Sequence, residues 1–233
     1  STARFYPFTK EGTPKKGFIK NINLQYSSKA DNRATLPDDL LFKKGMFENS
    51  KNGMLHMIPI STNFKAFKFF SISMGGNYQE VWALKTKRYF DYNEVDGAVE
   101  EEIKGFDRFA MYNYSASMTT NIYGTLNFKP DKKIQSIRHI ITPSLSYSNS
   151  PSFEKYYDTY IIDAEGNTAE YTRFQGGLYG SPSKSFGSSI SIGIQNSLEA
   201  KVKPKDSSQT ELKKIKLLNN LNITTSYNLA VEE

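Results

Sequence analysis

The sequence contains no cysteine and no long apolar run. The absence of cysteine excludes disulfide bonds and thiolate metal sites, although it does not fix the cellular compartment. Because no stretch of roughly 18 or more apolar residues occurs, a bilayer-spanning helix is excluded, and only a closed β-barrel would carry this chain across a membrane.

Apolar residues are scarce as well, at 38% with a mean hydropathy of -0.56, which is sparse for an ordinary globular core. Aromatic residues, in contrast, make up 14% of the chain, and they fit strands and membrane interfaces better than disordered segments. The formal charge of +6 arises from 30 basic residues spread among 24 acidic ones without a dense basic stripe, which argues against nucleic-acid binding. Low hydropathy with many aromatics favours a barrel.

Residues 109–128 separate by parity into an apolar and a polar set, as the two-residue period of a β-strand requires. The even positions carry apolar or aromatic side chains, including Tyr112, Tyr114, Met118, Ile122 and Leu126. The odd positions carry amides and hydroxyls, including Asn113, Ser115, Ser117, Thr119 and Asn121. Residues 186–202 and 217–229 have the same design, and weaker versions run over 18–28 and 70–82.

Two further strands are expected at 54–64 and 137–148, although Pro59 and Pro143 lie inside them. Proline has no N–H to donate, so both strands need a bulge or a place of weak pairing. The total is seven candidate strands, several of them longer than the roughly 9–11 residues that cross a bilayer at a tilt.

The expected connections alternate in length. They are long at 28–54, 84–107 and 149–185, short at 65–68 and 129–133, and intermediate at 203–214. Outer-membrane barrels have short turns on one side and long loops on the other, and in an up-and-down barrel successive connections fall on opposite sides. The prediction is therefore an all-β, antiparallel up-and-down transmembrane β-barrel. Because single-chain bacterial barrels have an even strand number, seven long strands predict an incomplete segment.

Several blocks resemble, in order, the barrel of LptD-type lipopolysaccharide-assembly proteins of a non-enteric, cysteine-poor branch. They are GMLHMIPISTNFKAFKFFSISMGGNYQEVW at 53–82, IRHIITPSLSYS at 137–148, GGLYGSPSKSFGSSISIGIQNSLEAKV at 176–202 and KKIKLLNNLNITTSYNLA at 213–230. The resemblance implies a bacterial outer-membrane barrel that receives lipopolysaccharide from a periplasmic bridge protein and releases it into the outer leaflet.

The same resemblance implies an LptE-like plug lipoprotein and contact with outer-membrane lipid. Residues 1–233 are then expected to form one segment of a single barrel domain, completed by the remaining barrel polypeptide. The family's periplasmic jellyroll has no counterpart in this chain, and neither do the cysteines that link jellyroll and barrel in enteric members. No cofactor, metal site or catalytic residue is expected, and the family implies transport instead of enzymatic activity.

Two groups of residues are candidates for function. Residues at the polar positions of the alternating strands are expected to line a hydrated lumen, where amides and hydroxyls can exchange hydrogen bonds with sugars. They are Asn21, Asn23, Gln25, Asn113, Ser115, Asn121, Asn222 and Thr224. The strand-weakening candidates are Pro59, Gly75, Gly76 and Pro143, which allow curvature or, near a seam, lateral exit. An aromatic belt at the bilayer interfaces is expected from Tyr26, Tyr78, Trp82, Tyr112, Phe128, Tyr147 and Tyr227.

Three alternatives stay open at this point. One is another outer-membrane barrel, a porin or receptor, and a second is a soluble carbohydrate-binding β protein with its apolar faces stacked together. The third is a histidine-dependent lipase or protease, which no local motif supports, since His139 is expected near a strand end in an interfacial or packing role. The acidic stretch 91–107 is expected to be a solvated loop, and its spacing matches no calcium-binding loop.

Overall fold

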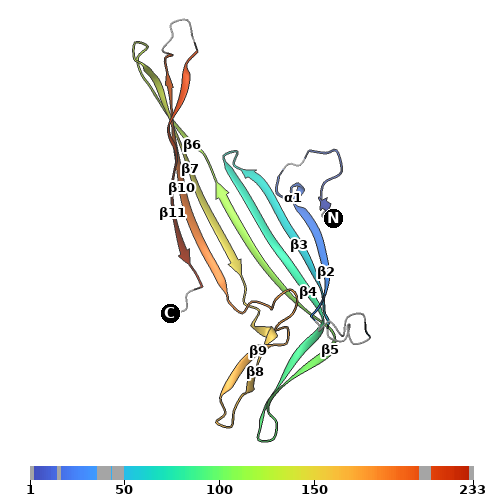
Figure 1. Cartoon of the computed structure of the whole chain (residues 1–233). Coiled ribbons are helices and arrows are strands. Elements are labelled where there is room, and N and C mark those ends of the chain that lie inside the picture. The colour runs from blue at the N-terminus through green and yellow to red at the C-terminus, as the bar shows by residue number, and fades with distance from the viewer. Residues whose placement is uncertain (1–2, 15–16, 36–42, 44–49, 205–210, 231–233) are drawn as a thin grey trace.

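The chain forms a large up-and-down antiparallel sheet that crosses the whole length of the molecule (Figure 1). The structure is a computed structural model that describes residues 3–14, 17–35, 43, 50–204 and 211–230. The strand order is β1-β2-β3-β4-β5-β7-β10-β11, with β6 paired to β7, and β8 and β9 form a separate two-stranded sheet. Chain neighbours are therefore sheet neighbours, as an up-and-down barrel requires.

The seven predicted strands are all present. Their bounds, with those of the smaller elements, are β1 Ala3–Phe5, α1 Gly17–Lys20, β2 Asn23–Ala34, β3 Ser50–Ala66, β4 Phe70–Asn93, β5 Gly97–Thr119, β6 Ile122–Asn127, β7 Ile134–Ser150, η3 Glu154–Tyr156, β8 Tyr157–Ile161, β9 Thr168–Thr172, β10 Gly187–Val202 and β11 Lys213–Asn228. The predicted strand 109–128 comprises the second half of β5 together with β6.

The two prolines explain the gaps in strand pairing. Between β2 and β3 the pairing is interrupted from Leu24↔Ile60 to Ser27↔Met57, which is where Pro59 lies. Pro143 lies opposite the break between β5 and β6: Thr120 donates its N–H to the Pro143 carbonyl at 3.3 Å, and no N–H returns from the proline. Both prolines stay in register with the neighbour on their other side, Pro59 with Asn77 and Pro143 with Ile194. The prediction of weak pairing at both sites is confirmed.

The prediction of a long loop at 84–107 is wrong. β4 continues to Asn93 and β5 begins at Gly97, so the connection is a hairpin whose two strands extend beyond the rest of the sheet. Cross-strand pairs of opposite charge hold this extension, such as Arg88↔Glu101 and Lys87↔Glu102. The charged residues that indicated a loop are thus paired with each other across a solvated ribbon.

The two ends of the sheet differ (Figure 1). The end called here the turn end carries the short β3–β4 and β6–β7 connections, at 67–69 and 128–133. The opposite end, called the loop end, carries the β4–β5 extension and the β8–β9 hairpin, which belongs to residues 151–186 between β7 and β10. The predicted long loop 28–54 is wrong at both ends, where residues 28–34 belong to β2 and 50–54 to β3; its centre lies outside the described residues, as does that of 203–214.

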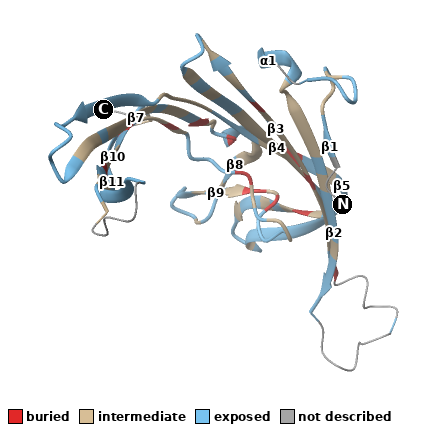
Figure 2. Ribbon diagram, turned by 90° about the horizontal axis from the view of Figure 1, so that it is seen from above, coloured by how far each residue is buried: buried red, intermediate tan, exposed pale blue. Residues whose placement is uncertain are grey.

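Strand register assigns every long strand the same two faces. One, called the polar face, carries the odd positions of β2, β3, β4 and β10, the odd positions of β5 from Asp107 onward and the even positions of β7; the other is called the apolar face. The sheet is curved, and β8 and β9 lie within the curve (Figure 2). Because Phe174 of residues 151–186 packs on Val81 and Phe109, the polar face is the concave one.

The molecule buries little apolar surface within itself. Val81, Phe109 and Phe174 form its small buried cluster. Large apolar side chains of the long strands stay exposed, including Met74, Tyr114, Leu145, Ile192, Ile194, Leu221, Ile223 and Tyr227. A second sheet stacked on the apolar face is absent from the described part of the chain. Within the described residues, no helix is both long and apolar enough to cross a bilayer.

Candidate functional site

The polar face brings together most of the residues expected to line a lumen. Asn23 and Gln25 of β2, Asn113 and Ser115 of β5, and Asn222 and Thr224 of β11 all lie on it by register, as does Asn121 in the break before β6. Asn21 does not: it lies in the turn before β2 and donates its amide to the Gly17 carbonyl at 2.8 Å. The expectation of a strand position for Asn21 is wrong because α1 occupies residues 17–20.

Neighbouring strands on the polar face are linked by short polar side chains. Asn23 donates to the Ser61 hydroxyl at 2.9 Å, Thr142 donates to the Asn121 side-chain oxygen at 2.7 Å, and the hydroxyls of Ser148 and Ser189 are 2.9 Å apart. Such groups both donate and accept, and they carry no net charge. The face can therefore exchange hydrogen bonds with a hydroxyl-rich ligand without holding it through strong ionic contacts.

Residues 151–186, called here the capping segment, cover the polar face at the loop end. The Phe174 ring is 3% exposed and lies 4.7 Å from the Phe109 ring, measured between centroids. An ion pair between Arg173 and Asp107 flanks this contact. Val81 and Phe109 stand at positions of the polar face, where the two-residue alternation predicted polar side chains. An apolar residue at such a position is the sequence signal for this contact.

The capping segment reaches across four strands. The Tyr179 hydroxyl donates to the Lys29 carbonyl of β2 at 3.0 Å, and the Lys51 ammonium of β3 donates to the Gly176 carbonyl at 2.7 Å. Gly53 of β3 accommodates the Tyr179 ring, whose nearest carbons lie 3.5 Å from where a Cβ would stand. The segment is therefore fixed from β2 to β5 at the loop end of the concave face.

The β8–β9 hairpin stacks on the extension of β4 and β5. Tyr89 lies 4.7 Å from both Tyr160 and Tyr171, and its hydroxyl donates to the Glu100 carboxylate at 2.5 Å. This hydrogen bond to a carboxylate raises the pKa of Tyr89 to about 12. The Lys87 ammonium and the Tyr89 hydroxyl lower the pKa of Glu100.

The apolar face carries the predicted aromatic belt residues. Tyr26, Tyr78, Trp82, Tyr112, Tyr147 and Tyr227 all share it by register, whereas Phe128 lies in the turn after β6. That these rings contact a bilayer interface stays a prediction.

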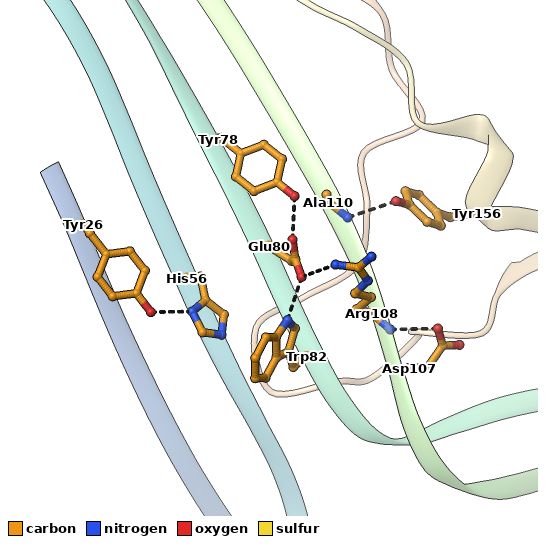
Figure 3. Close-up of polar contacts among 9 residues, drawn as sticks. All are labelled: Tyr26, His56, Tyr78, Glu80, Trp82, Asp107, Arg108, Ala110 and Tyr156. Carbon is orange, nitrogen blue, oxygen red and sulfur yellow. Dashed lines mark hydrogen bonds and ion pairs between the residues drawn. The ribbon is translucent and has the colours of Figure 1, made fainter. Parts of the chain in front are cut away.

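A polar cluster interrupts the apolar face near the loop end (Figure 3). The Glu80 carboxylate accepts hydrogen bonds from the Tyr78 hydroxyl at 2.5 Å, the Trp82 indole at 2.7 Å and the Arg108 guanidinium at 2.9 Å. Its side chain is 12% exposed, while that of Arg108 is 64% exposed. The alternation of polar and apolar residues does not predict this cluster, although an acid between two aromatics at i−2 and i+2 on one strand face is a visible signal.

His56 continues the cluster toward β2. Its ring lies 4.3 Å from Trp82, and its Nδ1 is 2.8 Å from the Tyr26 hydroxyl. Aromatic rings with polar tips, gathered at one level of a sheet, are the side chains enriched where a bilayer meets water.

Comparison with known proteins assigns the family. The sequence profile described as LptD protein matches residues 1–233, the whole chain. The chain belongs to the LptD family. No curated protein and no solved structure matches it. The family is an outer-membrane lipopolysaccharide transport and assembly family and is not known for enzymes, and this member lacks cysteine.

Within this LptD-family chain neither histidine forms part of a nucleophilic arrangement that the structure describes. His139 was expected near a strand end. It lies inside β7 instead, where its Nε2 is 3.1 Å from the Asn196 side-chain oxygen. His56 contacts Tyr26 and Trp82. Both rings have packing roles, which was the role expected for His139.

The two glycines of β4 cause no bulge. Gly75 and Gly76 stay in register with β3 and with β5. A Cβ on Gly76 would lie 3.1 Å from the Asn113 carbonyl, a tight contact that would require the neighbouring strand to shift slightly. The glycines thus allow close approach of the strands in this LptD-family sheet; their role in any seam stays a prediction.

The acidic stretch 91–107 does not gather a metal site. Lys87 pairs with Glu100 at 2.5 Å and Lys85 with Glu102 at 2.7 Å, which neutralises two of its carboxylates. Among the described residues no group of three or more histidine, aspartate or glutamate side chains is placed to hold a metal ion.

Proposed function

We propose that this LptD-family chain is one segment of the outer-membrane barrel that inserts lipopolysaccharide into the outer leaflet. In this proposal residues 1–233 belong to a single barrel domain, and the remaining barrel polypeptide pairs with the two outer edges of the sheet, at β11 and at β1 with the part of β2 that β1 leaves unpaired. An LptE-like plug lipoprotein occupies the interior, and a periplasmic bridge protein delivers the lipid. The jellyroll that receives it is not part of this chain.

One observation carries the proposal: the sheet separates an amide and hydroxyl face from an apolar face along its strands. On the apolar side, roughly 13 residues from Phe70 to Trp82 rise roughly 3.3 Å each, which at a tilt of roughly 45° spans roughly 30 Å. That length matches a hydrocarbon core. The Glu80 and Trp82 cluster then lies at one boundary, and the capping segment with the β4–β5 extension lies outside it.

The polar face suits the saccharide part of lipopolysaccharide. Sugars present many hydroxyl groups, and each finds neutral partners such as Asn113, Ser115 and Thr224 on the curved wall. Many weak contacts allow a ligand to enter and leave, as transport requires. The acyl chains, which cannot be hydrated, stay with the outer-membrane lipid on the apolar side.

The test is depletion of the complete protein from cells, followed by complementation with variants. Asn113→Ile combined with Ser115→Ile makes the polar wall apolar, and Ala116→Ile combined with Met118→Ile places the same side chains on the apolar face as a control. We expect depletion and the first pair to reduce lipopolysaccharide at the cell surface, and the control pair to restore it. Normal surface lipopolysaccharide after depletion, with loss of solute uptake or ion conductance, would assign a porin or receptor instead.

A further inference from the structure

Arg33 and Lys51 are directly opposite each other on β2 and β3, on the polar face at the loop end. Like charges at opposed cross-strand positions repel and destabilise a sheet. Such a pair is tolerated where water screens it or where an anion lies between the charges. The surroundings of this pair favour the anion.

Neighbouring cations on the same face are neutralised by carboxylates of the chain. Lys29 pairs with Asp31, Lys85 with Glu102 and Lys87 with Glu100, at 2.7, 2.7 and 2.5 Å. Within the described residues, no carboxylate lies within ion-pair distance of Arg33 or Lys51; the Lys51 ammonium donates instead to the neutral Gly176 carbonyl. Among the described residues, charge is therefore balanced around this position, and two positive charges lie together at it.

A hollow of about 370 Å³ adjoins the pair between the strand ends and the capping segment. Its walls are Arg33, Thr35, Lys51, Gly176, Gly177 and Leu178. The side chains supply a planar guanidinium fork, an ammonium and a hydroxyl, three kinds of donor that suit a phosphate group. Gly176 and Gly177 add no side chain to the far wall, which Leu178 shares, and the volume is enough for a phosphate with an attached sugar.

We propose that Arg33, Thr35 and Lys51 bind the phosphate of a phosphorylated saccharide as it passes the loop end of the concave face. This inference rests on the proposed function and adds a specific anionic subsite to an otherwise neutral wall. Arg33 takes the phosphate in two parallel hydrogen bonds, and Lys51 contributes a second charge that shifts from the Gly176 carbonyl to the ligand.

The experiment measures binding by calorimetry to the complete protein carrying this chain, purified in detergent. The probes are phosphorylated core oligosaccharide released from lipopolysaccharide by mild acid, the same oligosaccharide after phosphatase treatment, and inorganic phosphate. The variant is Arg33→Gln with Lys51→Gln. The matched control is Lys129→Gln with Lys133→Gln, which removes two charges from exposed lysines at the turn end. Unchanged thermal unfolding of each variant shows that it is folded.

We expect the Arg33 and Lys51 variant to lose roughly tenfold or more in affinity for the phosphorylated oligosaccharide, and the control to lose none. Phosphatase treatment should weaken binding to the unmodified protein by a similar factor. Three results would overturn the inference: equal weakening by the control, equal binding of the dephosphorylated sugar, or inorganic phosphate binding as tightly as the oligosaccharide. Since binding is measured without transport, failure of the depletion experiment is distinguishable from failure here.

Discussion

Single residues decide how the capping segment is held on the concave face. Phe174 and Phe109 are 3% and 1% exposed, and they form the centre of the small core. Tyr156 and Tyr179 of the segment pack partly buried against them, and Phe153 and Pro182 are buried as well. The remaining contacts are ion pairs and hydrogen bonds to exposed groups, which contribute little to stability, so the buried rings provide most of the attachment.

Replacing Phe174 by alanine should release the capping segment without unfolding the sheet. The loss of a buried ring costs about 3–5 kcal/mol, and here the ring lies at the centre of the cluster on which Tyr156 and Tyr179 also pack. Limited trypsin digestion should then cut faster at Lys155, Arg173 and Lys184. Phe69→Ala, at a ring that is 73% exposed at the turn end, serves as the control and should leave digestion unchanged. Equal digestion of both variants would contradict this attachment.

The pKa of Glu100 predicts how the extension of β4 and β5 responds to acid. Lys87 and Tyr89 lower the pKa of this carboxyl below its ordinary value of 4.5, so the folded hairpin favours the ionised form. Its stabilising contribution is present above pH 4.5 and is lost as the pH falls through the lowered value. Protection of residues 85–103 from hydrogen exchange, taken relative to the intrinsic exchange rate at each pH, should fall over that acidic range, and Glu100→Gln should remove most of this fall. If the variant loses protection in acid as the unmodified protein does, a titrating group other than Glu100 is responsible.

Glu80 is the residue on which the apolar-face cluster depends. Its carboxylate satisfies three donors, and removing the charge leaves Arg108 and the Trp82 indole with weaker partners. Glu80→Gln should lower the free energy of unfolding by about 1–3 kcal/mol, measured by urea titration in detergent micelles. Glu94→Gln, at an exposed acid in the turn of the β4–β5 hairpin, is the control and should change it little. A neutral result for Glu80→Gln would show that the cluster is not structural.

At the scale of strands, two-residue alternation was sufficient to predict all seven long elements and their shared faces. It failed at 84–107, because the charged residues there form opposed pairs such as Arg88↔Glu101, and a solvated ribbon has no apolar face to reveal its period. It also failed at Asn21, where a four-residue helix ends just before the strand begins. The Phe174 contact depends on residues far apart in sequence, which local patterns do not report.

Pro143 offers a test of how the break between β5 and β6 arises. The Thr120 N–H already donates to the Pro143 carbonyl, so valine at position 143 would supply the missing return donor and join the two strands. Pro143→Val should stabilise the sheet by about 0.5–1.5 kcal/mol and slow hydrogen exchange at residues 119–122. Surface lipopolysaccharide should remain unchanged, since this proline is assigned to ordinary curvature. Loss of surface lipopolysaccharide would instead give the break a role in exit.

At the scale of the whole molecule, the curved sheet leaves its apolar face without any protein layer among the described residues. A soluble protein would cover such a face with a second sheet, which is the arrangement that the rival carbohydrate-binding hypothesis requires. An LptD-family barrel covers it with lipid and turns the polar face toward water. The choice between these environments underlies the proposed function.

Site-directed spin labelling of the complete protein in lipid vesicles tests this choice most directly, because the chain has no cysteine of its own. Labels at Met118 and Ile192 occupy the apolar face, and labels at the adjacent Ser117 and Ser191 occupy the polar face. We predict that the first two collide with dissolved oxygen and are shielded from a water-soluble nickel chelate, and that the second two show the reverse. Equal nickel access at all four positions, or an inverted pattern, would contradict the account.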